Sequence, residues 1–312
     1  MRAIKVRAFG AADQLTMSEV PDLLPGKGQL VIRVEVIGVG LVDVLKRRGS
    51  IGGDPGFIPG SEVAGRVISV GPDVDDGLMG LRVFVQGSGG GYAEQFLAEA
   101  SAVVVLPDQL SSEDAVALGI NSLVALFCVR QTRLKRGDQV LIRGGSGGIG
   151  LSSVQAAARL GAVVTAITRS EAASKIEALG ANRVVRRDIG EKVTGPFDVI
   201  IDPVGGDDLS AFIGTLAVNG RYVLVGAAAG FPEATFGRAL LGMFQKSPSF
   251  SVFSMASVSP EEVRAAADQI FGAATQGSLI PVIGGLFSLS EAATAHSSLE
   301  SGDVIGKVLL RP

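Results

Sequence analysis

The chain has 312 residues, of which 47% are hydrophobic and 19% charged, with a net charge of −3 and one cysteine, Cys128. This length predicts two domains, each with enough apolar side chains for a packed core. The acidic balance excludes the basic face of a nucleic-acid-binding protein, and a single cysteine excludes an intrachain disulfide and a Cys-rich metal site. The uninterrupted apolar runs are shorter than the roughly 20 residues of a membrane span, and the charged start of the chain is a poor signal peptide, so we expect a soluble, cytoplasmic protein.

The first hundred residues predict a β-rich domain. Alternating or β-branched apolar residues, which are typical of strands, lie at 30–36, 63–70 and 82–86. The glycine-rich stretch 87–91 is interpreted as a turn, because no helix pattern follows it. Near Ser111, which forms a capping-box-like start with Asp114, a long apolar segment begins at 115–129.

Strand and helix patterns then alternate along the chain. Strands are expected at 139–143, 163–168, 197–202 and 221–226, and helices at 149–160, 171–179 and 260–274. A sixth strand is expected at 249–255, where small polar and large apolar residues alternate. This alternation predicts a parallel sheet with helices on both of its faces.

A glycine-rich motif lies between the first expected strand and helix of this region. Gly145, Gly147 and Gly150 match G-x-G-x-x-G, a motif that is credible in a strand–turn–helix context. Missing β-carbons let the backbone approach a pyrophosphate, whose charge meets the N–H groups at the start of the helix. The motif therefore predicts dinucleotide binding at Ser146, Gly147, Gly148 and Ile149.

The end of the second strand indicates which dinucleotide is bound. An NAD-binding protein usually has Asp or Glu there to hold the adenosine ribose, whereas this strand ends in Thr168, Arg169 and Ser170 with no carboxylate until Glu171. Hydroxyls and a guanidinium suit a 2′-phosphate. We therefore expect NADPH rather than NADH, bound by five residues: Thr168, Arg169, Ser170, Lys175 and Arg187.

Five motifs occur in the order found in the medium-chain dehydrogenases/reductases: PGSEVAGRV at 59–67, GYAE at 91–94, the glycine loop at 145–150, DPVGG at 202–206 and GK at 306–307. Over nearly its whole length the chain resembles the zinc-free quinone oxidoreductase branch, which includes the zeta-crystallins. The resemblance implies an α/β fold: a GroES-like β-barrel domain from 1–119 and 258–312, and a Rossmann doubly wound parallel sheet from 120–257, with the cofactor cleft between them. Further cofactor contacts are expected from Val204, Gly226, Ala227 and Phe253.

The same resemblance implies that the protein has no catalytic metal site. The positions that bind catalytic zinc in related alcohol dehydrogenases correspond to Gly40, Ser61 and Ile120, and none of these side chains is a ligand that zinc prefers. We therefore expect no metal. The substrate pocket is expected at Gly40, Leu41, Leu45 and Asn121. It should be apolar and roomy, because Gly40 and Leu45 replace an Asn and a Tyr that often line it.

No catalytic side chain is assigned, because the nicotinamide would supply the hydride and a reduced quinone can take its proton from water. His296, in a segment remote from every motif, is expected to be a surface or packing residue. Asp202 ends a strand where site residues collect, and a loop-supporting role is equally open. Structural roles are expected for Tyr92, Tyr222, Cys128, Glu62 and Asp43.

These observations predict an NADPH-dependent reductase acting on a quinone or a small enone. The alternatives are a trans-2-enoyl thioester reductase, which a groove for a pantetheine arm would distinguish, and a non-catalytic NADPH-binding protein similar to the crystallins. A homodimer is expected through the edge strand at 249–255, which lacks the charges and prolines that protect an edge. In the alternative, a loop covers that strand in a monomer.

Overall fold

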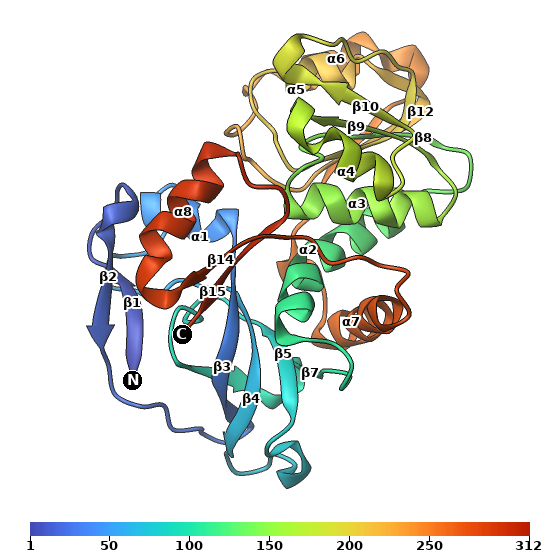
Figure 1. The fold of residues 1–312 in the computed structure, drawn as a ribbon. Helices are drawn as coiled ribbons and strands as arrows, with labels where there is room; N and C mark the ends of the chain where they lie inside the picture. Colours follow the sequence, from blue (N-terminus) through green and yellow to red (C-terminus); the bar gives the residue numbers. More distant parts are fainter. The chain divides into compact units, whose positions relative to one another are not determined.

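The computed structural model describes residues 1–312, which divide into two compact units. The terminal unit contains residues 1–120 and 259–312, and the central unit contains residues 121–258. Both chain ends therefore belong to the terminal unit (Figure 1). Each unit has its own hydrophobic core, so each buries enough apolar surface to hold its sheet together.

The terminal unit is built on a largely antiparallel sheet. The strands run in the order β14-β15-β3-β4-β5-β7, with β6 also paired to β3, and β1 and β2 form a separate hairpin. The strand bounds are β1 (Arg2–Val6), β2 (Leu15–Glu19), β3 (Gln29–Val39), β4 (Glu62–Val70), β5 (Arg82–Gln86), β6 (Gln95–Glu99), β7 (Val103–Val105), β14 (Ile283–Ser288) and β15 (Lys307–Arg311). The helices are α1 (Leu41–Arg48), α7 (Pro260–Thr275) and α8 (Ala292–Ser301). The three early strands predicted from the sequence are confirmed by β3, β4 and β5.

The central unit is a six-stranded sheet in which every pair of neighbouring strands is parallel. The order is β10-β9-β8-β11-β12-β13, so the first strand lies in the middle and the direction of winding reverses between β8 and β11. Ligands of doubly wound sheets bind at that reversal, outside the carboxyl ends of the strands. The bounds are β8 (Gln139–Ile142), β9 (Val163–Thr168), β10 (Arg183–Arg186), β11 (Phe197–Asp202), β12 (Leu216–Leu224), β13 (Ser249–Val252), α3 (Gly148–Arg159), α4 (Ala173–Ala178), α5 (Leu209–Ile213) and α6 (Gly237–Gly242).

Two predicted strands differ in length from those observed. β12 begins at Leu216, earlier than the expected start at Arg221, and its backbone turns through Asn219 at a φ of 58°. β13 ends at Val252 rather than Met255, because Ser254 instead begins a turn in which its hydroxyl accepts a hydrogen bond from Ala256 N. The glycine stretch after β5 is a turn, as predicted, because Gly87 through Gly91 contain no helix.

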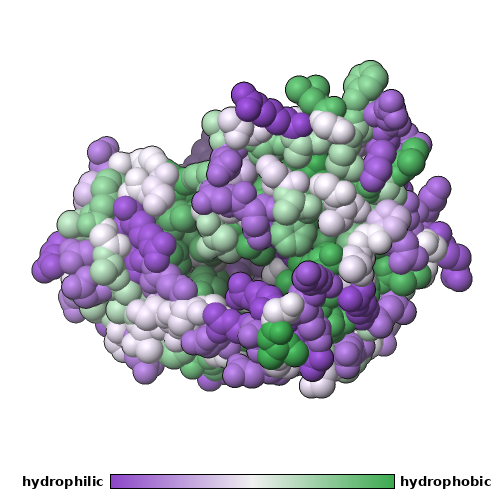
Figure 2. Space-filling view, turned by 90° about the horizontal axis from the view of Figure 1, so that it is seen from above, coloured by the Kyte–Doolittle hydropathy of each residue, from purple (hydrophilic) through white to green (hydrophobic).

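Helix α2 (Ser112–Gln131) corrects the expectation that no segment is long and apolar enough to cross a membrane. Its length and composition pass that test, although Gly119, Asn121 and Ser122 interrupt the apolar run that the sequence presents. In the structure, 78% of its apolar window is buried, which is typical of the core helix of a soluble protein. On the face shown in Figure 2, hydrophilic and hydrophobic residues are interspersed.

Candidate dinucleotide site

The glycine loop joins β8 to α3. Gly145 N donates a hydrogen bond to Ile167 O at 2.8 Å, and Gly147 N donates to Gly144 O at 3.1 Å, which ties the loop to the end of β9 and to itself. Helix α3 begins after Gly147, and no side chain caps it. The first N–H groups of α3, which have no partner inside the helix, therefore face the position where an anion would bind.

The glycines of this loop serve different purposes. A β-carbon at Gly150 would lie 2.1 Å from Gly144 O, and one at Gly148 would lie 2.1 Å from Asn121 Nδ2. A β-carbon at Gly147 would have its nearest neighbour at 3.6 Å, which is an ordinary contact. Packing therefore requires glycine at 148 and 150, whereas at 147 the bare backbone is open to a ligand. Asn121, expected in the substrate pocket, has its amide against this loop.

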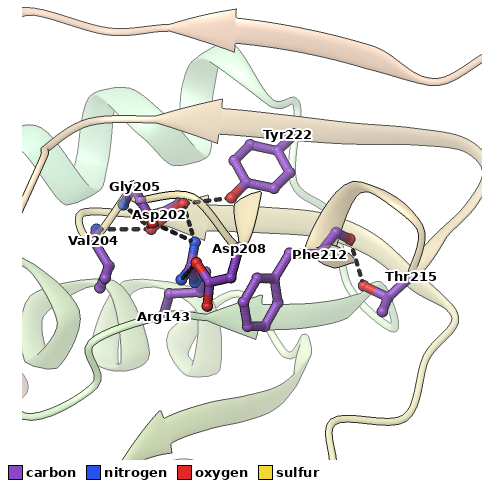
Figure 3. A network of polar contacts seen from close by, with 8 residues as sticks. All are labelled: Arg143, Asp202, Val204, Gly205, Asp208, Phe212, Thr215 and Tyr222. Atoms are coloured by element: carbon purple, nitrogen blue, oxygen red, sulfur yellow. Dashed lines mark hydrogen bonds and ion pairs between the residues drawn. The ribbon is translucent and has the colours of Figure 1, made fainter. Parts of the chain in front are cut away.

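A buried polar network lies at the carboxyl ends of β8, β11 and β12 (Figure 3). Arg143 Nη1 donates hydrogen bonds to Asp202 Oδ2 at 2.8 Å and to Gly205 O at 3.0 Å, and Nη2 donates to Asp208 Oδ1 at 2.7 Å. The Tyr222 hydroxyl donates to Asp202 Oδ2. The guanidinium carbon of Arg143 also lies 3.9 Å from the centre of the Phe212 ring, so the cation is held by ion pairs and by an aromatic face.

This network fixes the loop after β11. Asp202 Oδ1 accepts hydrogen bonds from Val204 N at 2.7 Å and from Gly205 N at 3.0 Å. The loop in turn touches the glycine loop, because a β-carbon at Gly144 would lie 2.9 Å from Val204 Cγ2. Of the two roles left open for Asp202, the structure therefore supports the loop-supporting one.

Sequence reasoning missed Arg143, although its position between the strand end and the first glycine was a usable signal. Burial lowers the pKa of Arg143, but Asp202 and its other partners raise it further, so the net pKa lies above the ordinary value. Burial, followed by the charge of Asp202, raises the pKa of the Tyr222 hydroxyl. Arg143 therefore stays charged and Tyr222 stays a donor across the neutral pH range.

The residues predicted to bind the adenosine end of the cofactor lie where β9 and β10 run side by side. Thr168 and Arg186 are register partners at the ends of these strands. The Thr168 side chain is buried, and its hydroxyl has no hydrogen-bond partner. Arg186 is bound by Glu191 through Nε at 2.9 Å, whereas Lys175 on α4 and Arg187 are exposed. Thr168, Arg169, Ser170 and Arg187 are thus brought to the ends of two adjacent strands.

A carboxylate that the sequence analysis did not foresee also lies here. Asp188, in the short turn Arg187–Ile189 after β10, accepts a hydrogen bond from Ser170 N at 2.9 Å. Asp188 follows β10 rather than β9, so it reaches Ser170 only because these two strands are neighbours in the sheet. A carboxylate therefore does stand at the end of β9.

The remaining expected contacts follow β12 and β13. A β-carbon at Gly226 would lie 2.5 Å from Pro203 O, so the backbone after β12 packs directly on the loop after β11. The Phe253 ring, just after β13, stacks on Phe127 with centroids 5.9 Å apart. Because the strands are parallel, the loops that follow β8, β9, β11, β12 and β13 all emerge at one edge of the sheet.

In the terminal unit, two buried carboxylates bind backbone N–H groups at or next to Gly40, Ser61 and Ile120, the positions predicted to correspond to zinc ligands. Asp43 on α1 accepts hydrogen bonds from Gly40 N at 3.0 Å and from Gly60 N at 2.9 Å. Helix α2 is kinked at Gly119, and the freed Ile120 N donates to Glu62 Oε2 at 3.0 Å. Glu62 also pairs with Lys307. Backbone donors and a lysine thus bind these carboxylates, which supports the structural roles expected for Asp43 and Glu62.

Burial disfavours the ionised form of the Asp43 carboxyl group. Burial raises the pKa of this carboxyl from 3.8 to about 6, although the two backbone hydrogen bonds oppose that shift. Gly40 and Leu41 lie at the start of the same helix, and Leu45 lies one turn later and half-buried. Three of the four expected pocket residues are therefore brought together on α1, whereas Asn121 belongs to the central unit.

The expectation that His296 is remote from every motif is wrong, and so is a surface position for it. It is fully buried on α8, and its Nε2 lies 2.9 Å from the hydroxyl of Tyr92 in the motif at 91–94. Burial, with the charge of Arg47, lowers the pKa of His296 to about 4, and burial raises the pKa of Tyr92. Both groups are therefore neutral packing residues at physiological pH. Cys128 is buried, which raises its pKa to about 12 and makes the thiol inert.

Comparisons with known proteins agree with this architecture. Residues 26–108 match the family model of the alcohol dehydrogenase GroES-like domain, and residues 179–310 match that of the zinc-binding dehydrogenases. The chain is 32% identical to mouse quinone oxidoreductase over 99% of its own length and 97% of that protein. It belongs to the quinone oxidoreductase branch of the medium-chain dehydrogenases/reductases.

Solved structures of this branch cover the whole chain. Escherichia coli quinone oxidoreductase in complex with NADPH superimposes with a TM-score of 0.93 at 25% identity, covering 100% of both chains. A mycobacterial protein in complex with NADPH gives a TM-score of 0.92 at 32% identity, also covering both chains fully. The chain also matches a polyketide synthase subunit of Mycobacterium tuberculosis at 30% identity, over 96% of its own length but 14% of that subunit.

Proposed function

We propose that this member of the quinone oxidoreductase branch is a cytoplasmic, metal-independent reductase that uses NADPH to reduce a quinone or a small enone. The observation that carries the proposal is the glycine loop, whose Gly147 is open to a ligand beside the uncapped start of α3. The chain resembles quinone oxidoreductases over its full length, which supports the choice of reaction. Two of its structural neighbours were solved with NADPH, which supports the choice of cofactor.

The chain's own residues would bind and orient the reactants. NADPH, when bound, supplies the hydride. The N–H groups at the start of α3 would hold the pyrophosphate, and Thr168, Arg169, Ser170, Lys175 and Arg187 would face the adenosine end. Asp202 would keep the Val204 loop in place beside the glycine loop, because it anchors both Val204 N and Gly205 N. The apolar first turns of α1, with Gly40, Leu41 and Leu45, would receive the substrate.

A side-chain proton donor is not required in this scheme. His296 and Tyr92 are buried against each other, and Asp43 and Glu62 are engaged by backbone N–H groups. A reduced quinone or enolate can take its proton from water. The residues at the zinc positions, Gly40, Ser61 and Ile120, offer no side chain suited to zinc, so we propose that the reaction proceeds without a metal.

A trans-2-enoyl thioester is the alternative substrate, favoured by the likeness to a segment of a polyketide synthase subunit. The two substrates share the same hydride acceptor, a conjugated carbonyl, and differ in the long arm of the thioester. Turnover of each substrate therefore distinguishes the two reactions.

A substrate panel tests the proposal. We expect the absorbance of NADPH to fall with 9,10-phenanthrenequinone or 1,4-benzoquinone and to fall at least tenfold more slowly with crotonyl-CoA, and EDTA or 1,10-phenanthroline to leave these rates unchanged. Elemental analysis of the purified protein should find no stoichiometric zinc. Faster turnover of crotonyl-CoA would select the thioester reductase. NADPH binding without turnover of any acceptor would select a non-catalytic binding protein.

We also propose a homodimer formed through β13. This strand is the edge of the parallel sheet, and its last residue, Val252, is 67% exposed. Other exposed apolar side chains come from the same part of the chain: Val218 within β12, and Phe231, Leu241 and Phe244 between β12 and β13. An apolar edge of this kind favours pairing with a second copy across a two-fold axis.

A further inference from the structure

The end of β9 presents donors that suit a phosphate, and one of them is already used. Ser170 N donates to Asp188 Oδ1 at 2.9 Å, and the Ser170 hydroxyl also interacts with this carboxylate, which is the main reason that the pKa of Asp188 is lowered. Asp188 therefore carries a full negative charge at neutral pH, and it lies against Ser170, one of the residues that the sequence assigns to the 2′-phosphate.

Charges of both signs lie around Asp188. Arg186, two residues earlier, is engaged by both oxygens of Glu191. The nearby cations along the chain also include Arg169, directly before Ser170, and the exposed Arg187 and Lys175, while Glu171 adds another exposed negative charge directly after Ser170. A 2′-phosphate arriving at Ser170 would thus meet an acidic group that competes for the same N–H.

We propose that Asp188 is a specificity-determining residue that narrows this protein's preference for NADPH over NADH. Its carboxylate holds the Ser170 donors that a 2′-phosphate needs, and it repels the phosphate. The 2′-hydroxyl of NADH carries no charge and can donate a hydrogen bond to a carboxylate, as it does to the acidic residue of NAD-binding sheets. The inference rests on the proposed use of NADPH and deepens it.

The buried Thr168 hydroxyl supports a ligand at this place independently of Asp188. It lies at the last position of β9, is 2% exposed and has no hydrogen-bond partner. A buried polar atom is normally satisfied, and a nucleotide at the end of β9 would supply a partner. Asp188 therefore stands at the rim of a polar site rather than on an unrelated surface.

The variant Asp188→Asn separates charge from shape. The amide keeps an oxygen for Ser170 N and replaces the other oxygen with a donor, so the loop should stay in place while the repulsion disappears. We expect the Kd of NADPH to fall roughly fivefold, as removal of one exposed like-charge contact suggests, and the Kd of NADH to rise about threefold. Titration calorimetry with each cofactor gives both values. The gain for NADPH should shrink as NaCl is raised from about 50 to about 300 mM, because salt screens the repulsion.

The matched control is Glu191→Gln, which removes the same charge from the same loop but from a carboxylate bound to Arg186 rather than Ser170. It should change the ratio of NADPH to NADH affinity less than Asp188→Asn does. Asp188→Ala, which frees Ser170 N altogether, should also tighten NADPH. The role of Asp188 would be overturned if Asp188→Asn and Glu191→Gln changed the ratio of NADPH to NADH affinity equally. It would also be overturned if Asp188→Asn left both this ratio and the melting temperature unchanged. Either result would leave the proposed function standing. Failure of the wild-type protein to bind NADPH would instead overturn the proposed function.

Discussion

At the scale of single residues, the glycine loop shows why glycine is present at each position. Gly148 and Gly150 are required by neighbouring atoms of the chain, an amide at 148 and a backbone oxygen at 150. Gly147 has the φ of −74° and ψ of 163° that any residue can adopt, and nothing in the chain crowds its missing side chain. The fold therefore does not require glycine at 147, and the missing side chain leaves room for the ligand that we propose there.

This difference gives a paired prediction. Gly147→Val should fold normally, with a melting temperature within a few degrees of wild type, and should bind NADPH at least about tenfold more weakly, because the branched side chain blocks the pyrophosphate. Gly150→Ala should instead lower the free energy of unfolding by roughly 1–3 kcal/mol, because its β-carbon would collide with Gly144 O. Thermal melts and cofactor titrations of both variants check this. Normal NADPH binding by Gly147→Val would remove the loop from the cofactor site.

At the scale of elements, ionised side chains fasten loops to the ends of strands and helices. Arg143 after β8 and Asp202 at the end of β11 meet because these strands are neighbours, and together they hold the loop that leads to α5. Asp43 does the same for α1, whose start it links to the backbone before β4 through Gly60. The loops of both units are therefore positioned by buried carboxylates.

Because the pKa of Asp43 is raised in the folded protein, the free energy of unfolding should depend on pH. The folded pKa of about 6 lies above the ordinary 3.8, so the folded chain holds this proton more tightly than the unfolded chain. The stabilisation is complete below about pH 3.8 and is lost as the pH rises through about 6. Asn at this position cannot titrate. We therefore expect the stability of wild type relative to Asp43→Asn to fall by roughly 1 kcal/mol between pH 5 and pH 7.5.

Urea unfolding at the two pH values measures this change. The matched control is Asp54→Asn, whose carboxylate is exposed on the loop after α1, and the difference between that variant and wild type should stay constant across the same range. If Asp43→Asn and wild type followed parallel pH profiles, the carboxylate would be ionised without penalty in the folded protein, contrary to its burial.

At the scale of the whole molecule, the exposed edge at β13 decides the expected assembly. Light scattering at micromolar concentration should give about twice the monomer mass of 31.9 kDa. Val252→Pro should shift the protein to monomer, because proline removes a backbone donor and disturbs pairing at an edge. The control Val252→Thr keeps a β-branched side chain and should remain dimeric. A wild-type mass near that of one chain would favour a monomer whose edge is covered by a loop.

The local features of this protein were predictable from the sequence. The alternation of strands and helices, the turn after β5 and the glycine loop each depend on residues close together in the chain, because side-chain periodicity and the steric freedom of glycine act locally. The order of the motifs also identified the family. The bounds of β12 and β13 were less accurate, since the pairing of Leu216 with Phe197 extends β12 and the cap at Ser254 ends β13 early.

Contacts between distant residues were decided only by the tertiary structure. His296 reaches Tyr92 across 204 positions, Arg143 reaches Asp202 across 59, and Asp188 reaches Ser170 because β10 lies beside β9. None of these pairs shares a local pattern, since each depends on which strands are neighbours and in what register. The sequence by itself determined that a glycine loop joins a strand to a helix, and it predicted a dinucleotide at that loop. Folding determined which charges meet there, because only the packed sheet brings the ends of its strands to one edge.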